Sequence, residues 1–338
     1  MKALVYDAPR KYEYREIPDP ELEPDEILMK IQACGLCGTD LHIHEGEFAP
    51  RFPLVPGHEF TGTVAETGSA VTGLATEQRV VANSNMACGH CFYCVRGDRL
   101  LCENLEAYGV TRNGGFAEYM KIKAHRVFPI SRLSPREAVM VEPSSCALHG
   151  MEVLNMEPGS DVLIFGAGPT GQVLAQLLKV NGAATLTAAA PAGPKLDLIG
   201  RLAADHTVAM DRKDPELHRR RLREIAPKGF DYVIEATGAP AVCEEAINFV
   251  RRRGTILVYG VYPEKASVRF DPFDVFRREI TIKGSFAQID SFQRALNYLE
   301  NGRIQVKEIV TQEIPLKDWG QALDLTWRRQ GIKTALVP

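Results

Sequence analysis

Four cysteines lie within fifteen positions of the chain, at a spacing typical of a structural zinc site. They follow the pattern C-x2-C-x2-C-x7-C and are Cys88, Cys91, Cys94 and Cys102. Four thiolates fill the tetrahedral coordination of zinc and leave no open position for a substrate. The charges around them nearly cancel and no basic helix follows, which argues against a nucleic-acid zinc finger. We therefore predict a closed zinc site that stabilises a lobe with little core of its own; unmetallated thiols are the alternative.

A second set of possible metal ligands lies nearer the N-terminus. Cys37 in CGTDLH, and His58 and Glu59 in PGHE, fall at the ends of β-like runs beside glycines. Three ligands with an open fourth position are the arrangement of a catalytic zinc. A lone cysteine is more often a packing residue, and a lone histidine is more often a hydrogen-bonded polar group. Their combination predicts that the reacting metal is bound here.

A glycine-rich segment, GAGPTG, is a candidate for binding a dinucleotide. It follows the apolar run DVLIF and precedes a helical pattern, which is the context this fingerprint requires. Its glycines would allow a tight turn, close approach of a pyrophosphate and close helix–strand packing, and the helix N-terminus would offer N–H groups. The predicted contact residues are Gly166, Gly168, Pro169, Thr170 and Gly171. A glycine turn with a purely structural role is the alternative.

The choice between NAD and NADP depends on the end of the next strand, expected near Ala190. A site for NAD usually has an acidic residue there, but none occurs between Ala183 and Asp197. Without this carboxylate a ribose 2'-phosphate is not repelled, and Lys195 or Arg201 could pair with it. The sequence thus favours NADP over NAD. The alternatives are a different strand pairing or NAD binding without the acid.

These residues are distributed over two types of sequence pattern. Up to about residue 147, short β-like runs are broken by proline and glycine, which predicts an irregular all-β or barrel-like region. From about residue 148, strands and helices alternate, which predicts a doubly wound parallel sheet. The residues after 286 are too few for another domain and are expected to complete the first. The predicted domains are 1–147 with 287–338, including a zinc lobe at about 84–104, and 148–286. The basic runs 218–223 and 251–253 are expected on solvated helical and turn surface.

Composition limits the class of protein. The 338 residues are 45% hydrophobic and 25% charged, which excludes a disordered chain. A net charge of -3 offers no general attraction to nucleic acid or to an acidic membrane. No apolar run approaches the roughly 20 residues of a membrane span, and the N-terminus lacks the apolar core of a secretion signal. A cytoplasmic protein with no nucleic-acid or membrane partner is expected.

Several motifs together carry a family resemblance. CGTDLHI, VPGHEFTGTV, the four-cysteine lobe, GGFAEY, VEPSSCALHG and GAGPTG occur in this order along the chain, which resembles the zinc-dependent medium-chain alcohol dehydrogenase family. Glu142 in VEPSS is similar to the branch that contains sorbitol, arabinitol and threonine dehydrogenases. The resemblance implies an α/β protein with a GroES-like, mainly-β catalytic domain and a Rossmann domain. It also implies a homodimer or homotetramer formed through the Rossmann sheet.

The resemblance assigns roles to individual residues. Cys37, His58 and Glu142 correspond to ligands of the catalytic zinc, with Glu142 bound directly or through water. Glu59 corresponds to a close or alternating ligand and a catalytic group. Thr39 corresponds to the start of a proton relay, and His42 to its solvent-side end. Zinc would act as a Lewis acid on the substrate oxygen while hydride passes to nicotinamide.

Two further expectations concern Asp40 and the substrate. Asp40 is expected to orient His58, with a simple turn or cap residue as the alternative. Sorbitol dehydrogenases that resemble this chain carry an arginine where Ala287 stands, after GSF. The resemblance therefore favours an arabinitol-type polyol dehydrogenase interconverting a secondary alcohol and a ketone, with sorbitol still possible as substrate. L-threonine 3-dehydrogenase and a general secondary-alcohol dehydrogenase are the alternatives. A non-enzymatic relative is disfavoured because the ligands and the glycine loop are present.

Overall fold

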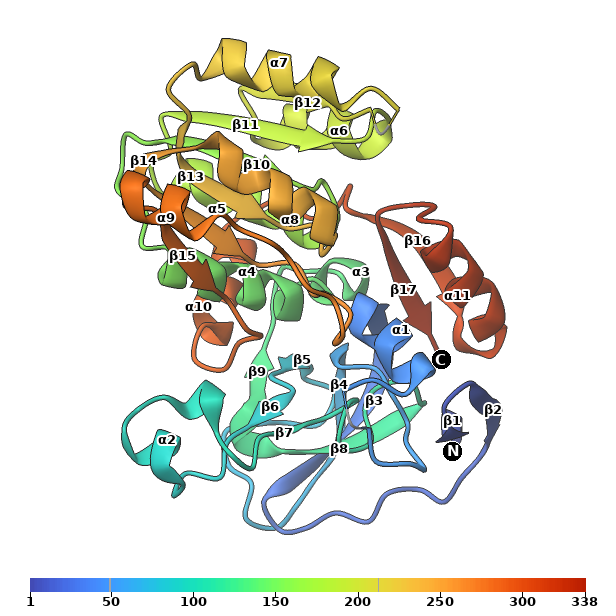
Figure 1. Ribbon diagram of the computed structural model, residues 1–338. Coiled ribbons are helices and arrows are strands. Elements are labelled where there is room, and N and C mark those ends of the chain that lie inside the picture. Colours follow the sequence, from blue (N-terminus) through green and yellow to red (C-terminus); the bar gives the residue numbers. More distant parts are fainter. Residues whose placement is uncertain (49, 212) are drawn as a thin grey trace. The chain divides into compact units, whose positions relative to one another are not determined.

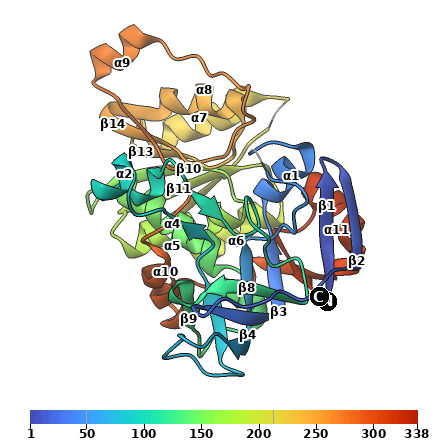
Figure 2. The ribbon, with the colours of Figure 1, turned by 90° about the horizontal axis from the view of Figure 1, so that it is seen from below.

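The computed structural model describes residues 1–338 apart from positions 49 and 212. The chain folds into two compact units, which we describe separately (Figure 1). The mainly-β unit contains residues 1–145, 288–302 and 306–338, and the α/β unit contains residues 146–287 and 303–305. Both chain ends belong to the mainly-β unit, at β1 and after β17 (Figure 2).

The mainly-β unit is built on a sheet of strand order β16-β17-β3-β4-β5-β9, in which β8 also pairs with β3. The unit also contains two separate two-stranded sheets, β1-β2 and β6-β7. Its strands are β1 Lys2–Ala8, β2 Lys11–Glu16, β3 Glu26–Leu36, β4 Glu59–Thr67, β5 Arg79–Ala82, β6 Asn85–Met86, β7 Glu106–Ala107, β8 Tyr119–Lys123, β9 Val127–Pro129, β16 Val310–Pro315 and β17 Lys333–Val337. Its helices are α1 Gly38–Glu45, α2 Phe92–Val95, α3 Pro135–Ala138, α10 Phe292–Glu300 and α11 Trp319–Trp327, and α4 Val141–Leu154 begins in it. The C-terminal strand β17 lies antiparallel to β3.

The core of this unit includes a buried polar network. Trp319 of α11 donates its indole N–H to the Tyr6 hydroxyl at 2.8 Å, and this hydroxyl lies 2.8 Å from Nδ1 of His44. The aromatic side chains pack with Phe116 and Met29 in one buried cluster. Burial raises the pKa of Tyr6 and lowers the pKa of His44. His44 therefore joins β1, α1 and α11 as a structural residue.

Helices occur where the sequence pattern predicted only strands. In the first turn of α1, the Asp40 side chain accepts a hydrogen bond from the N–H of Cys37, the N-cap residue, at 2.8 Å. The helix is terminated by its C-cap Gly46, whose φ is 87°. Before α3, Ser134 and Glu137 form a reciprocal capping box. Both helices are short and are stabilised by their caps rather than by an apolar periodicity. The expectation of an all-β region up to residue 147 was therefore wrong in these segments.

The α/β unit contains a sheet of strand order β12-β11-β10-β13-β14-β15, in which every pairing is parallel. Its strands are β10 Asp161–Phe165, β11 Thr185–Ala190, β12 His206–Ala209, β13 Phe230–Glu235, β14 Val250–Val258 and β15 Thr281–Gly284. Its helices are α5 Pro169–Val180, α6 Pro194–Leu202, α7 Pro215–Ile225, α8 Pro240–Ala246 and α9 Pro272–Arg278. The order reverses between β10 and β13, where doubly wound sheets bind ligands beyond the carboxyl ends of the strands. The predicted doubly wound sheet is confirmed.

The two basic runs lie on different kinds of element. Residues 218–223 are on α7, as expected. Residues 251–253 were expected on helix or turn surface, but they begin β14 and are exposed at that end of the strand. There Arg251 pairs with Asp231, and Arg253 lies 3.5 Å from Glu279. Helix α8 ends at Ala246, and a short 3-10 helix, Ile247–Phe249, leads into β14.

Among the helices of the described residues, none is long and apolar enough to cross a membrane.

Candidate active site

The four clustered cysteines have the geometry of a tetrahedral metal site. Sγ of Cys88 lies 4.0 Å from Sγ of Cys94, and Sγ of Cys91 lies 3.8 Å from Sγ of Cys102. Four sulfurs at about 2.3 Å from a zinc ion are about 3.8 Å apart, whereas a disulfide needs about 2.05 Å. All four sulfurs lie within 4.8 Å of one another. The thiols therefore fit a closed zinc site and form no disulfides.

Backbone amides of the lobe donate hydrogen bonds to its thiols. Sγ of Cys102 accepts hydrogen bonds from the N–H groups of Cys88 and Asn104, at 3.2 and 3.3 Å. Backbone hydrogen bonds from His90 and Cys91 lower the pKa of the Cys88 thiol to about 6, whereas burial raises the pKa of the Cys94 thiol. Because zinc binds the thiolate form, the amides around Cys88 favour metal binding at that cysteine.

The pairing of β3 with β4 brings the second group of ligands together. Cys37 directly follows β3, His58 directly precedes β4, and Glu59 opposes Gly35 in the antiparallel register. One ligand atom from each of Cys37, His58 and Glu59 lies within 4.8 Å of the others. Gly35 makes room for the carboxylate, since a Cβ there would lie 2.0 Å from Oε2 of Glu59. His58 and Glu59 are buried, and Cys37 is half-buried.

Glu142 lies in the first turn of α4 and is also buried. Its charge contributes to the raised pKa of His58, so it faces the same region. Its carboxylate does not belong to the group of ligand atoms within 4.8 Å. The structure thus brings Cys37, His58 and Glu59 into one cluster, and Glu142 remains a predicted ligand.

Sequence reasoning missed a buried lysine in this cluster. Nζ of Lys333 donates to Oε1 of Glu59 at 2.6 Å, and both side chains are almost fully buried. Burial alone would lower the pKa of Lys333, but the charges of Glu59, Cys37 and Asp40 outweigh burial and raise it. The lysine therefore stays charged. No local motif marks it, because it lies 274 residues from Glu59 and reaches the site only through the pairing of β17 with β3.

Asp40 both caps α1 and faces His58. Its Oδ2 accepts the Cys37 N–H, and its Oδ1 lies 3.7 Å from Nδ1 of His58, which is longer than a hydrogen bond. Burial raises the pKa of Asp40 to about 6. Burial would lower the pKa of His58, but Asp40 and Cys37 raise it well above its usual value. Asp40 is therefore a helix cap that also lies close to His58, and its predicted role in orienting His58 stays a prediction.

The predicted proton-relay residues lie on one face of α1. Oγ1 of Thr39 is 3.8 Å from Sγ of Cys37, and His42 follows three residues later, on the same side of the helix. Nδ1 of His42 pairs with the carboxylate of Glu47, and its ring meets Phe48 edge-on at 5.1 Å. The sequence reasoning did not identify Glu47; its place just after the helix was the available signal.

The glycine loop between β10 and α5 has the conformation of a dinucleotide fingerprint. Gly166 has a φ of 110°, a region that favours glycine. A Cβ at Gly171 would lie 2.3 Å from the Gly166 carbonyl oxygen, whereas a Cβ at Gly168 would meet no atom within 4 Å. Pro169 and Thr170 begin α5 and are half-buried. Gly166 therefore provides the tight turn, Gly168 the open side and Gly171 the close packing, as expected for this fingerprint.

The ribose end of the site begins where β11 ends, at Ala190. This alanine is buried, and no carboxylate occurs before Asp197. Lys195 is the second residue of α6 and half-buried, whereas Arg201 is exposed in the last turn. At about 1.5 Å of rise per residue, Arg201 lies about 9 Å further along the helix axis than Lys195. The structure thus places Lys195, but not Arg201, at the helix end next to Ala190.

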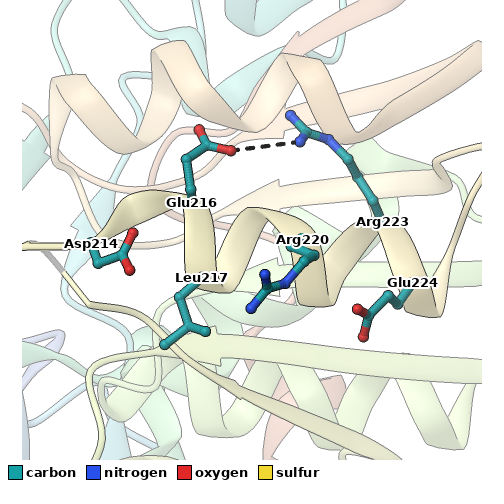
Figure 3. A pocket seen from close by; sticks show the side chains of 6 residues that line it. All are labelled: Asp214, Glu216, Leu217, Arg220, Arg223 and Glu224. Carbon is teal, nitrogen blue, oxygen red and sulfur yellow. Dashed lines mark ion pairs between the residues drawn. The ribbon is translucent and has the colours of Figure 1, made fainter.

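A surface cavity of about 440 Å³ lies on α7, and none of the predicted site residues lines it (Figure 3). It is lined by Asp214, Glu216, Leu217, Arg220, Arg223 and Glu224. Glu216 and Arg223 pair at 3.8 Å along one side of the helix.

The comparisons with known proteins agree with this geometry. Residues 23–132 match the family model of the alcohol dehydrogenase GroES-like domain, and residues 169–301 match that of the zinc-binding dehydrogenases. The chain is 48% identical to D-arabinitol dehydrogenase 1 of Uromyces fabae, over 100% of this chain and 97% of that protein. It is 36% identical to D-altritol 5-dehydrogenase of Agrobacterium fabrum, over 94% of each chain. A zinc-binding dehydrogenase structure from Sinorhizobium meliloti, bound to NADP, aligns with a TM-score of 0.91 and 32% identity, covering 100% of this chain and 99% of that one.

The fold, the thiol sites and the glycine loop define a zinc-dependent oxidoreductase that uses a nicotinamide cofactor. The chain belongs to the zinc-binding alcohol dehydrogenase family. The predicted family and its GroES-like and Rossmann architecture are confirmed.

Proposed function

We propose that this enzyme interconverts a secondary alcohol of a polyol and the corresponding ketone, with D-arabinitol as the first candidate. The observation that carries the proposal is the buried cluster of Cys37, His58 and Glu59, whose donor set is that of a catalytic zinc. The relation to an arabinitol and an altritol dehydrogenase supports the choice of polyols. When bound, zinc supplies Lewis-acid polarisation of the substrate oxygen, and the nicotinamide cofactor exchanges hydride with the substrate carbon.

Within this proposal, Cys37, His58 and Glu142 are the zinc ligands, and Glu59 is a close or alternating ligand. Lys333 neutralises Glu59 and holds its carboxylate. The negative charge of Glu59 is therefore compensated by the protein itself, through the buried ion pair with Lys333. The four-cysteine lobe holds a second, structural zinc.

Thr39 and His42 move the alcohol proton toward solvent in the proposed mechanism. A carboxylate only accepts hydrogen bonds, so Glu47 places the imidazole proton on Nδ1 of His42. Nε2 is then free to accept the proton that arrives from Thr39. Glu47 also stabilises the imidazolium that this transfer produces.

We propose that NADP is preferred to NAD. The end of β11 offers no carboxylate to the ribose hydroxyls, and the proposed partner of a 2'-phosphate is Lys195, in the first turn of α6. Arg201 is the weaker candidate because it lies near the other end of the helix. The NADP bound to the Sinorhizobium meliloti protein supports this preference.

We also propose a homodimer or homotetramer that associates through the edge of the parallel sheet. β15 ends the sheet order, and large apolar side chains are exposed on it, just after it and on the preceding helix α9. They are Phe273, Phe276, Ile282 and Phe286. A second copy would cover this apolar surface and pair the open edge.

A cytoplasmic location fits the free thiols, which a reducing compartment preserves.

An activity screen tests the substrate assignment. The zinc-loaded enzyme is assayed with NAD and NADP across C4 to C6 polyols, L-threonine and simple secondary alcohols, with Cys37→Ser as the matched inactive control. We expect the highest kcat/KM with a polyol, D-arabinitol first. Turnover of threonine without turnover of polyols would refute the polyol assignment.

A further inference from the structure

Gln172 is a fully buried polar residue of α5 that the roles above do not use. It directly follows the last glycine of the glycine loop. Its Nε2 donates to the carbonyl oxygen of Ala167 at 3.1 Å and to that of Lys195 at 2.7 Å. Both acceptors are carbonyls, so the NH2 end of the amide must face them. Gln172 therefore joins the glycine loop to the first turn of α6.

The two carbonyls belong to the segments that would bind neighbouring parts of the dinucleotide. Ala167 lies inside the glycine loop, at the pyrophosphate, and Lys195 lies beyond the end of β11, at the adenosine ribose. In a trans peptide the C=O group and the following N–H group point in opposite directions. Because the Ala167 carbonyl points toward the Gln172 amide, the Gly168 N–H points away from that amide. The side of Gly168 on which a Cβ would lie is open.

The remaining atom of the amide argues for a positioning role. Oε1 of Gln172 is buried and has no hydrogen-bond partner among the described residues. An unpaired buried acceptor costs free energy, so the two hydrogen bonds from Nε2 are made while one oxygen stays unpaired. What the amide provides is a fixed separation between the two carbonyls.

We propose that Gln172 is a positioning residue for the dinucleotide, which sets the distance between the pyrophosphate-binding and ribose-binding segments. The proposal rests on the use of a nicotinamide dinucleotide by this site. The Gln172 amide hydrogen-bonds backbone carbonyls only, so it should act on NAD and NADP alike, in contrast to the side chain of Lys195.

The chain offers a matched control one turn further along α5. Gln176 is also buried, donates to the Gln305 carbonyl at 3.0 Å and accepts from the Gln305 N–H at 2.8 Å. Its Nε2 also donates to the backbone carbonyl of Gln172 at 3.3 Å, within α5, but among the described residues it makes no hydrogen bond to the glycine loop or to α6. Gln172→Met and Gln176→Met each replace a buried amide by an unbranched side chain with good helix propensity.

The experiment titrates NAD, NADP and ADP-ribose into each zinc-loaded protein by calorimetry. Gln172→Met should raise Kd for all three about tenfold, as expected when two hydrogen bonds that order a site are lost. The cofactor KM should rise with Kd, while kcat at saturating cofactor stays within about twofold of wild type. Gln176→Met should leave every Kd within about twofold and lower only Tm.

Equal Kd values for Gln172→Met and Gln176→Met would overturn the inference. An unfolded Gln172→Met protein beside a folded Gln176→Met protein would also overturn it, because the amide would then be needed for the fold itself. Wild-type enzyme that binds neither NAD nor NADP would instead refute the dinucleotide function on which the inference rests.

Discussion

Removing one member of the buried Lys333–Glu59 ion pair should destabilise the fold, because each buried charge is compensated by the other. Lys333→Met removes the cation and leaves the Glu59 carboxylate buried without it. Breaking a buried ion pair from one side costs about 3 to 5 kcal/mol of unfolding free energy. The double variant Lys333→Met with Glu59→Gln removes both charges and should recover most of this loss.

A surface pair provides the control. Lys179 lies 2.9 Å from Asp205, with both side chains about a third exposed, so Lys179→Met should cost about 0 to 1 kcal/mol. Unfolding free energies are measured by urea titration of zinc-free protein at pH 5 and pH 8. Burial of a lone carboxylate disfavours its charged form, so the destabilisation in Lys333→Met requires an ionised Glu59. The loss of stability should then be largest at pH 8 and shrink toward pH 5. Equal losses in the two single variants, or no recovery with Glu59→Gln, would refute the reasoning.

Three further changes address the cofactor, the cysteine lobe and the relay. Ala190→Asp should add a charge-assisted hydrogen bond to the NAD ribose and repel a 2'-phosphate, moving the kcat/KM ratio toward NAD by about tenfold or more; an unchanged ratio would show that another group reads the ribose. Cys91→Ser should lower Tm and zinc content while the zinc at Cys37 is retained, and normal Tm with loss of turnover would contradict a structural lobe. His42→Ala should lower kcat by about tenfold or more and Glu47→Gln by less, measured as pH–rate profiles; identical profiles for all three proteins would exclude the relay.

Much of the α/β unit could be predicted because its local patterns are unambiguous. The run DVLIF is buried throughout after its first residue and becomes β10, and GAGPTG follows it as a turn into α5. The end of β11 at Ala190 was also expected, from the length of the apolar run. Here local periodicity and glycine chemistry determine both the element and its boundary.

The remaining parts depend on contacts that no local pattern carries. α1 is stabilised by the Asp40 cap, and its weak apolar periodicity gave no helical signal. Lys333 and Gln172 are ordinary polar residues in sequence, and their roles appear only when β17 meets β3 and α6 meets α5. Contacts between residues far apart in the sequence, such as those made when β17 pairs with β3, therefore limit what the sequence alone can predict about the site.

Zinc content and turnover of Cys37→Ser test the central claim most directly. We propose that the reacting metal binds at the cluster of Cys37, His58 and Glu59 and that a structural metal binds in the cysteine lobe. The variant should fold, bind NAD or NADP, lose one zinc per chain and have no measurable turnover. Wild-type turnover in Cys37→Ser with that zinc absent would contradict the account.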